Sequence, residues 1–312
     1  MTIKTDLFTF FKNYIEEIEK KLSPTTIQNY KNTIDRLDEY QRVKNLKLDF
    51  ESIDLEFYTK YYQYLTEEIN FSPSTIEKHL KVIKTVLNNA SERGFNKSFK
   101  YKTKKFKFPS YEIENIYLGE DELYEMEKLD LSNNPRLEKV RDLFLVGCWT
   151  GLRFSDFSNI LPENINKRYI KITTQKTGET VVIPLHPSVK NILNKYRNKY
   201  PNNLPPAISN AKTNKYIKEI GELIPSLHEK ELKTKYKAGR KITLRLEKYK
   251  LITTHTARRS FATNLYLKKV PSITIMKITG HQTEGAFLQY IKADGYEHAD
   301  LISSVWESNQ FA

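Results

Sequence analysis

The chain has 312 residues, with 51 Lys or Arg against 38 Asp or Glu and a single cysteine, Cys148. This length suffices for two domains that each bury a core, and the net charge of +13 favours an anionic partner. No apolar run approaches the roughly 20 residues of a membrane span, no signal peptide is expected, and one cysteine forms no intrachain disulfide, which excludes membrane and disulfide-scaffold classes and favours the cytoplasm.

The first 90 residues predict a helical domain. Apolar residues recur every three or four positions, the period of one helix face, at residues 7–22, 27–37, 58–69 and 76–87. Ser23-Pro24 and Ser72-Pro73 each supply a hydroxyl cap followed by proline at the first helical position. Gly94 fits a C-cap. We therefore expect a helical domain over residues 1–94.

A basic, aromatic-rich segment follows at residues 95–114. Residues 91–110 carry seven Lys or Arg against one Glu, and Pro109 interrupts the segment. We predict a linker between two domains. A charged segment of this kind is either a solvated linker or a contact to the backbone of a nucleic acid. The candidate DNA contacts in it are Lys97, Lys100, Lys102, Lys104, Lys105 and Lys107.

Residues 115–312 predict a second, mixed domain. A buried helical stripe at residues 137–148 stops at Thr150-Gly151. Strands are expected at residues 169–174 and 181–185, joined by a tight turn at Lys176-Thr177-Gly178-Glu179. Further helices are expected at residues 212–223, 254–268, 273–279 and 283–291.

A second basic block lies at residues 228–250, with nine Lys or Arg against three Glu. Residues 233–237 and 241–246 are expected to pair as a β-hairpin around Gly239. Its exposed cations would suit contact with phosphates. The candidate DNA contacts here are Lys235, Lys237, Arg240 and Lys241.

Several residues could carry chemistry. His255 and Arg258 share a face at the start of a predicted helix capped by Thr253 or Thr254, which is a favourable phosphate site. Arg153 follows the Gly151 turn, where Ser155 can cap the next helix, and it either grips a phosphate or pairs with Asp156. Taken singly, each of these residues is better explained by packing or by an ordinary surface contact. The same holds for three others, namely Lys176 at the hairpin tip, His281 after Gly280, and Tyr290 on the last predicted helix before the tail.

The ordered set is more informative than its members. Its text is TGLRFSDF, TTQKTGETVVIPL, THTARRSFATNLY and ITGHQTEGAFLQYI. This resembles the tyrosine recombinase family, the phage-integrase-like site-specific recombinases. All six positions of the family's active-site set are filled in order, and the resemblance covers residues from about 115 to 294 and, more weakly, the N-terminal half. The six are Arg153, Lys176, His255, Arg258, His281 and Tyr290.

The resemblance implies a mainly α fold with a small antiparallel β-sheet in the catalytic domain. It implies two domains that close on DNA as a C-shaped clamp: a SAM-like core-binding domain at residues 1–94 and a catalytic domain with a C-terminal tail at residues 115–312. The linker at residues 95–114 would cross the duplex. Because the predicted helices begin close to Met1, we expect no arm-binding domain ahead of them.

The resemblance also implies a chemistry. Tyr290 would attack phosphorus and form a 3′-phosphotyrosyl ester, while Arg153 and Arg258 hold the non-bridging oxygens. Lys176 would protonate the leaving 5′ oxygen. The remaining roles are that His255 acts as general base or acid, His281 hydrogen-bonds the phosphate, and Asp156 orients the basic side chains. The sequence contains no HExxH motif and no cysteine pair, so we expect no metal and no other cofactor.

The expected function is therefore that of a site-specific DNA recombinase, the integrase of a mobile element or phage. The alternatives are an Xer-type chromosome-dimer-resolving recombinase, a tyrosine-type topoisomerase and a non-catalytic DNA-binding protein of the same fold. Expected partners are double-stranded DNA, further copies of the chain in a tetramer on paired sites, and accessory DNA-bending proteins, with no membrane. The expected location is the cytoplasm, on the bacterial nucleoid when bound to DNA.

The tail after Tyr290 is weakly amphipathic. We expect it to dock on a neighbouring copy, and the alternative is that it folds back on its own domain. Its apolar residues are Leu301, Ile302, Val305 and Trp306.

Overall fold

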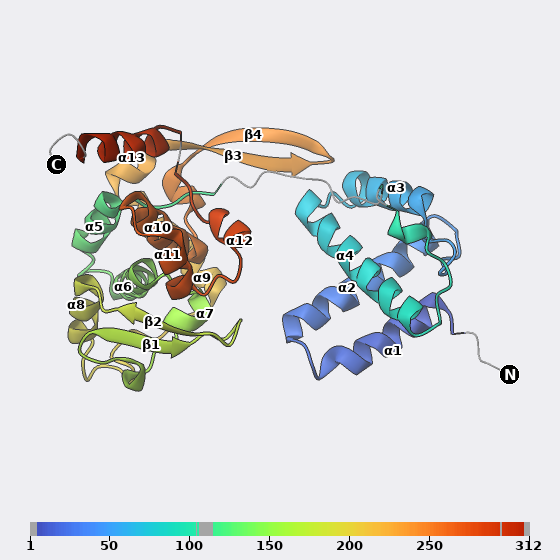
Figure 1. Cartoon of the computed structure of the whole chain (residues 1–312), viewed down its shortest axis with the longest axis horizontal. Coiled ribbons are helices and arrows are strands. Elements are labelled where there is room, and N and C mark those ends of the chain that lie inside the picture. Colours follow the sequence, from blue (N-terminus) through green and yellow to red (C-terminus); the bar gives the residue numbers. More distant parts are fainter. Residues whose placement is uncertain (1–4, 104, 106–114, 294, 309–312) are drawn as a thin grey trace. The chain divides into compact units, whose positions relative to one another are not determined.

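The computed structural model describes residues 5–103, 105, 115–293 and 295–308 and divides the chain into two compact units (Figure 1). The first unit is Met1–Ile113 with Thr234–Leu244, and the second is Glu114–Lys233 with Arg245–Ala312. Within the described ranges, no helix combines the length and the apolar character needed to cross a membrane.

Helices build the first unit, as the apolar periods predict. Its elements are α1 (Leu7–Glu19), α2 (Pro24–Val43), α3 (Leu55–Gln63), the π-helical turn η1 (Tyr64–Glu68), α4 (Pro73–Glu92) and the 3₁₀ turn η2 (Lys100–Lys102). The Oγ atoms of Ser23 and Ser72 accept hydrogen bonds from the backbone three residues on, at 3.3 Å in each case, so both predicted caps are confirmed. The helix expected at residues 58–69 is not uniform, because α3 gives way to η1 at Tyr64.

The start of the basic segment at residues 95–114 packs on the first unit. Tyr101 is buried, and its hydroxyl donates to Asn88 Oδ1 at 3.0 Å and lies 3.1 Å from Ser91 Oγ. Asn96 and Ser98 are also buried. Residues 95–103 are therefore folded against α4. Lys104 and Lys107 lie outside the described residues.

The second unit is organised around α6 (Pro135–Thr150), which is buried on almost every side (Figure 1). It contacts α5, α8, α9 and α10. Neither α5 nor α8 is among the predicted helices. The helical elements of this unit are α5 (Glu120–Lys128), α6, α7 (Phe154–Phe157), η3 (Pro162–Asn164), α8 (Pro187–Lys195), α9 (Asn210–Glu222), η4 (Pro225–His228), η5 (Lys248–Leu251), α10 (Thr254–Leu267), α11 (Ser272–Thr279), α12 (Glu284–Leu288) and α13 (Gly295–Ser308).

Two small sheets have two strands each, as the hairpin patterns predict. Strands β1 (Tyr169–Thr173) and β2 (Thr180–Pro184) are antiparallel, and Ile170 faces Ile183 on the buried side. Strands β3 (Lys230–Lys237) and β4 (Arg240–Glu247) are joined by Ala238 and Gly239, whose positive φ angles of 47° and 74° suit a two-residue hairpin turn. No residue of β3 or β4 is buried.

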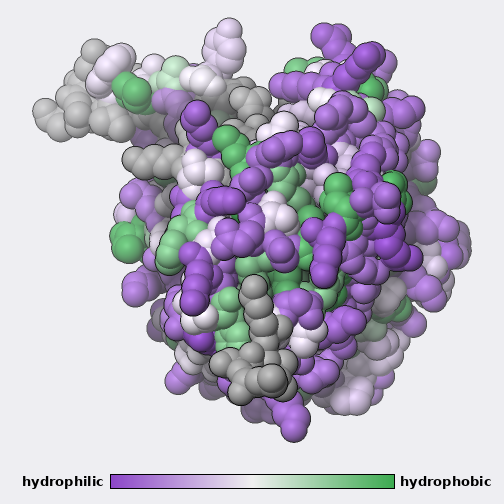
Figure 2. Space-filling model, turned by 90° about the vertical axis from the view of Figure 1, so that its right-hand side faces the viewer, coloured by the Kyte–Doolittle hydropathy of each residue, from purple (hydrophilic) through white to green (hydrophobic). Residues whose placement is uncertain are grey.

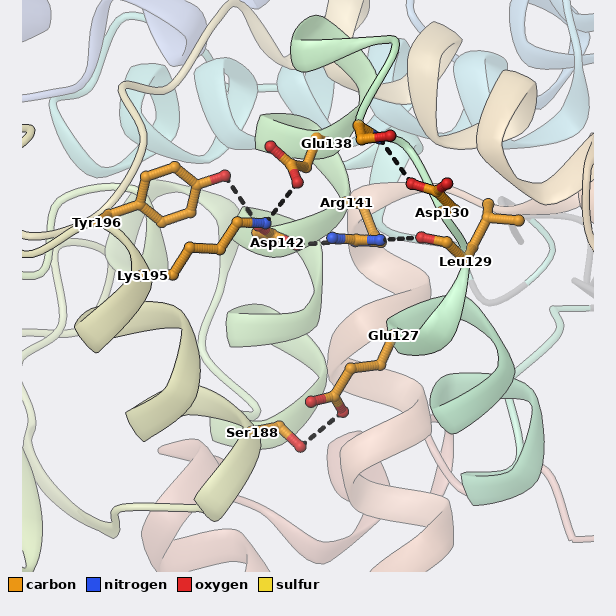
Figure 3. Close-up of polar contacts among 10 residues, drawn as sticks. Glu127, Leu129, Asp130, Glu138, Arg141, Asp142, Ser188, Lys195 and Tyr196 are labelled. Carbon is orange, nitrogen blue, oxygen red and sulfur yellow. Dashed lines mark hydrogen bonds and ion pairs between the residues drawn. The ribbon is translucent and has the colours of Figure 1, made fainter.

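A buried ionic cluster connects α6 to α8 (Figure 3). Asp142 on α6 accepts hydrogen bonds from Arg141 Nε at 2.7 Å, Lys195 Nζ at 2.5 Å and the Tyr196 hydroxyl at 2.8 Å. Lys195 also pairs with Glu138 at 2.8 Å. Each charge in the cluster has an opposite charge beside it, which compensates for its removal from water.

Two sequence-based details of the second unit are wrong. Tyr290 is not on a helix: α12 ends at Leu288, and Tyr290 lies in the following turn. The Tyr290 carbonyl accepts instead a tertiary hydrogen bond from Thr263 Oγ1 on α10, a partner that a local sequence pattern does not reveal. The N-cap of α7 is Arg153 and not Ser155, and Thr253 caps α10 as one of the two predicted residues.

The C-terminal helix α13 packs on its own unit. Tyr117 donates a hydrogen bond to Glu297, and the His298 ring lies 5.8 Å from the Tyr266 ring. Ile302 and Trp306 are exposed at the edge of a hollow of about 480 Å³ beside Tyr266. The side chains of Leu301 and Val305 lie outside the described residues. In the single chain the tail therefore folds back, and docking on a neighbour stays a prediction.

The surface is strongly hydrophilic. Figure 2 shows a face in which purple hydrophilic residues dominate and green apolar residues form smaller areas between them. This agrees with a mean hydropathy of −0.61 for the chain.

Candidate active site

Arg153 is positioned by a glycine turn at the end of α6. Gly151 adopts φ 68°, and a Cβ at this position would collide with the ring of Phe261, so only glycine fits. The turn buries Leu152 and leaves Arg153 at the N-cap of α7. Its Nη1 atom is buried and has no hydrogen-bond partner within the described residues. This guanidinium therefore has donor capacity to spare.

Arg258 on α10 connects three segments of the second unit. The side chain is only 1% exposed. Its Nη1 donates to the Gly151 carbonyl at 2.8 Å, and its Nη2 donates to the Thr279 carbonyl and lies 3.3 Å from His281 Nε2. Its Nε has no partner among the residues described. Two backbone carbonyls thus fix the guanidinium, but no carboxylate forms an ion pair with it in the described part of the chain.

His281 follows Gly280, which ends α11 with φ 64°. Its Nδ1 lies 2.7 Å from Thr279 Oγ1. Burial and the charges of Arg258 and Arg153 lower the pKa of His281 from 6.5 to about 3. The imidazole is therefore neutral at pH 7. Because it lies beside two cations, it is suited to form a hydrogen bond with a negatively charged group.

Tyr290 lies against these groups. Its ring centroid is 4.7 Å from that of His281 and 5.5 Å from Arg258 Cζ, and the side chain is half-buried. The backbone N–H of Tyr290 donates to the Phe287 carbonyl at 2.8 Å, which closes the turn after α12. A phenol, two guanidiniums and an imidazole thus share one small region.

Asp156 connects α7 to the β1–β2 turn. It is buried, and its Oδ1 accepts a hydrogen bond from the Gln175 backbone at 2.9 Å. Lys176, the next residue, is exposed at the hairpin tip, as predicted. Among the ion pairs of the described residues, none joins Asp156 to Arg153, and Asp156 Oδ2 has no partner there. Asp156 therefore holds the turn that carries Lys176.

His255 is exposed in the first turn of α10. Partial burial lowers its pKa below 6.5, and the nearby charges of Arg259, Arg258, Arg153 and Lys176 act in the same direction. These charges are thus within electrostatic reach of one imidazole. His255 joins the cluster through space, whereas Arg153, Arg258, His281 and Tyr290 join it by contact or by shared neighbours.

Arg259 is a site residue that the sequence reasoning missed. Burial lowers its pKa, and Tyr290 acts in the opposite direction, so it too lies near the phenol. It lines a hollow of about 210 Å³ together with His255 and Thr253. The signal was present in the doublet Arg258-Arg259, which carries two cations on successive positions of one helix.

The electrostatics of the cluster point to an anionic ligand. Burial and the charge of Arg153 lower the pKa of Arg258, while Tyr290 and Asp156 act to raise it. A buried cation that forms no ion pair costs several kcal/mol, at least about 3 by analogy with broken buried pairs. A phosphate would supply both the charge and the acceptors for Arg153 Nη1 and Arg258 Nε. No group of three potential metal ligands occurs within the described residues.

The candidate DNA-contacting residues that the structure describes lie on exposed surface. Lys97, Lys100, Lys102 and Lys105 are exposed in the first unit, with Lys100 paired to Glu51 at 3.8 Å. The four candidate cations of the β3–β4 hairpin are exposed as well: Lys235, Lys237, Arg240 and Lys241. The contacts that hold the cluster together, as given above, involve none of these cations.

Comparison with known proteins identifies the family. The model of the phage integrase SAM-like domain matches residues 6–108, and that of the phage integrase family matches residues 120–295. This chain belongs to the phage integrase family, whose members are tyrosine recombinases. The match spans Arg153 to Tyr290, so the integrase-family region contains the whole cluster.

Solved integrases share the fold of this family member. A lambda integrase (residues 75–356) dimer bound to a COC′ core site matches with a TM-score of 0.68 at 15% identity, over 93% of this chain and 96% of that chain. The Tn1549 transposon integrase (residues 82–397) in complex with transposon right end DNA matches with a TM-score of 0.68 at 13% identity, over 97% and 99%. A search of curated protein sequences gave no match.

Proposed function

We propose that this chain is a site-specific DNA recombinase that cuts and rejoins strands through a 3′-phosphotyrosyl intermediate on Tyr290, and that it acts as the integrase of a mobile element or phage. The observation that carries the proposal is the pair of arginines, Arg153 and Arg258, in one cluster with Tyr290, each with a buried nitrogen atom that has no partner among the described residues. The fold similarity to lambda and Tn1549 transposon integrases supports the mobile-element role.

In the proposed reaction the Tyr290 oxygen attacks phosphorus, and the bond from phosphorus to the 5′ oxygen breaks. Arg153 and Arg258 stabilise the charge that grows on the non-bridging oxygens. His281, neutral before DNA arrives, hydrogen-bonds the phosphate. His255 takes the phenolic proton as general base, which suits an imidazole whose pKa is lowered by the surrounding cations.

The leaving 5′ oxygen requires a proton. Lys176 supplies it from the β1–β2 turn, and this exposed position lets the ammonium reach a bound duplex. Asp156 keeps the turn in place through the Gln175 amide. Rejoining reverses the steps, with a 5′ hydroxyl attacking the phosphotyrosyl ester.

DNA would be held by both units. The first unit and the exposed cations at residues 97–107 and 235–241 would contact phosphates without reading sequence. We propose the domain division at residues 1–94, 95–114 and 115–312, a tetramer on paired sites, and accessory DNA-bending proteins. A lambda integrase tetramer bound to a Holliday junction shares the fold with a TM-score of 0.68 at 16% identity, which supports the tetramer.

The test is covalent capture on DNA. Nicked duplexes with randomised sequence let the cleaved end diffuse away, which traps any adduct. Wild-type protein should yield an adduct whose peptide carries the nucleotide on Tyr290, and Tyr290→Phe should bind DNA equally and yield none. Tyr296→Phe is the matched control, since Tyr296 is 84% exposed on α13. An adduct that persists in Tyr290→Phe, or that maps to Tyr296, would overturn the assignment. Relaxation of supercoiled DNA without pairing of sites would indicate a topoisomerase.

A further inference from the structure

Thr263, on α10, contacts the backbone at the candidate nucleophile and two residues after it. Its Oγ1 donates to the Tyr290 carbonyl at 3.3 Å and accepts from the Lys292 backbone N–H at 3.2 Å. The side chain is fully buried. One hydroxyl therefore uses both its donor and an acceptor on a single turn of the chain.

We propose that Thr263 is a positioning residue for the strand-cleavage step, which keeps the Tyr290 phenol over the guanidinium of Arg258. This inference rests on the proposed role of Tyr290 as nucleophile.

The first argument concerns how the Tyr290 turn is held. On its N-terminal side, the Tyr290 and Ile291 amides donate to the carbonyls of Phe287 and Leu288 at 2.8 and 3.2 Å, which ties the turn only to the five-residue helix α12. On its C-terminal side, Thr263 ties the turn to α10, a helix of 14 residues. The Thr263 hydroxyl thus connects the backbone of this turn to a long helix by two hydrogen bonds.

The second argument concerns Arg258, which lies on the same helix. Five residues separate Arg258 from Thr263, or about 7.5 Å along the axis at 1.5 Å per residue. The Arg258 and Thr263 side chains both project from α10. The position of the Arg258 guanidinium relative to the Tyr290 backbone, which Thr263 binds, is therefore set by a single helix. An error of about 1 Å between nucleophile and phosphate can cost about 100-fold in rate. The placement of the Tyr290 hydroxyl relative to phosphorus can therefore depend on the hydrogen bonds of Thr263.

The third argument is that packing alone does not require a hydroxyl here. The neighbouring buried cluster is apolar, with Phe261, Ala262, Ile275, Met276 and Phe287. Valine has nearly the same shape and suits such surroundings better. The hydroxyl is explained by its two backbone partners, and both belong to the segment that carries Tyr290.

The test compares Thr263→Val, which removes both hydrogen bonds, with Thr263→Ser, which retains them. On a nicked duplex that wild-type protein cleaves, Thr263→Val should lower the rate of adduct formation about 10- to 100-fold with DNA affinity changed less than twofold. Thr263→Ser should restore most of the rate. Amide exchange in the peptide containing Lys292 should be faster in Thr263→Val alone.

The matched control is Thr213→Val. Thr213 on α9 is also buried, and its hydroxyl bonds the backbone at the start of its own helix, donating to the carbonyl of the N-cap Ser209 at 3.1 Å. This variant should lose similar stability and keep the wild-type cleavage rate. If Thr263→Val cleaves at the wild-type rate, or if both Val variants lose rate in proportion to stability, the inference is wrong while the role of Tyr290 stands. If wild-type protein forms no adduct, the proposed function fails, and the exchange data still report whether Thr263 holds the turn.

Discussion

Two clusters of charged side chains lie largely buried in the second unit, and they differ in whether their charges are balanced by partners. Around Asp142, each oxygen of the carboxylate accepts at least one hydrogen bond, and Arg141 and Lys195 supply the balancing charges (Figure 3). Around Arg258, two arginines lie together, and each keeps a nitrogen without a partner within the described residues. Both clusters depend on α6, since Asp142 lies on it and Gly151 ends it, about 13 Å further along the axis at 1.5 Å per residue.

This contrast suggests a structural role for the Asp142 cluster and a ligand-binding role for the Arg258 cluster. A closed set of charges needs nothing more and gives the unit a specific arrangement of α6 against α8. An open set of cations is costly unless a ligand completes it. Within this pair of clusters, the unsatisfied polar atoms of the Arg258 cluster, more than charge itself, support our proposal that it is the functional one.

The largest expected effect concerns the open cluster. Arg153→Lys and Arg258→Lys keep a positive charge but lose the planar fork, so adduct formation should fall about 100-fold or more while DNA affinity changes little. Rates on a nicked duplex and gel-shift affinities measure the two quantities separately. If affinity and rate fell together, these arginines would only bind DNA, and the contrast would lose its functional side.

The closed cluster should respond in stability instead. Asp142→Asn removes the negative charge that Arg141 and Lys195 share, and we expect a loss of about 3 kcal/mol in the free energy of unfolding, as for other broken buried pairs. Urea unfolding measures the loss. Cleavage per folded molecule should stay at the wild-type value, and a large drop in that value would show that the two clusters are not separate.

The Arg258 cluster should also make the free energy of unfolding depend on pH, through His281. The folded-state pKa of His281, about 3, lies below its ordinary value of 6.5. Between these pH values the unfolded chain binds a proton that the folded chain does not, so the free energy of unfolding falls as pH is lowered from 6.5 toward 3. Allowing for the partial exposure of the ring, we expect His281 to contribute about 2 kcal/mol to this fall. His281→Gln should flatten the profile measured without DNA, and an unchanged profile would contradict the lowered pKa.

The smallest expected effect concerns four lysines of the basic segment at residues 95–114. Replacing Lys102, Lys104, Lys105 and Lys107 with Gln should reduce the slope of log affinity against log salt by about 0.9 for each phosphate that these side chains no longer neutralise, equally for all DNA sequences. Two exposed lysines outside the basic blocks, Lys12 and Lys47, provide the control substitution. An unchanged slope would favour the solvated-linker interpretation of residues 95–114.

The sequence predicted what local physics controls. Ser23 and Ser72 cap their helices, Gly151 ends α6, and Lys176 lies at the tip of a hairpin, because each depends on a few neighbouring residues. The candidate site followed from the order of six residues along the chain, and the structure gathers them in the second unit.

What the sequence did not predict depends on contacts between distant segments. The turn at Tyr290 is bonded to Thr263, 27 residues earlier. The burial of Arg258 follows from carbonyls at Gly151 and Thr279. The Asp142 cluster joins residues 53 and 54 positions apart, to Lys195 and Tyr196. None of these partners leaves a periodic or local signal.

The most direct test is to locate the phosphate. A crystal structure of Tyr290→Phe bound to a duplex that the wild-type protein cleaves would show the uncleaved scissile phosphate in place. The account predicts that Arg153 Nη1 and Arg258 Nε, neither of which has a partner among the residues described here, lie within hydrogen-bond distance of its non-bridging oxygens. A scissile phosphate that lies elsewhere, with both nitrogens still without partners, would contradict it.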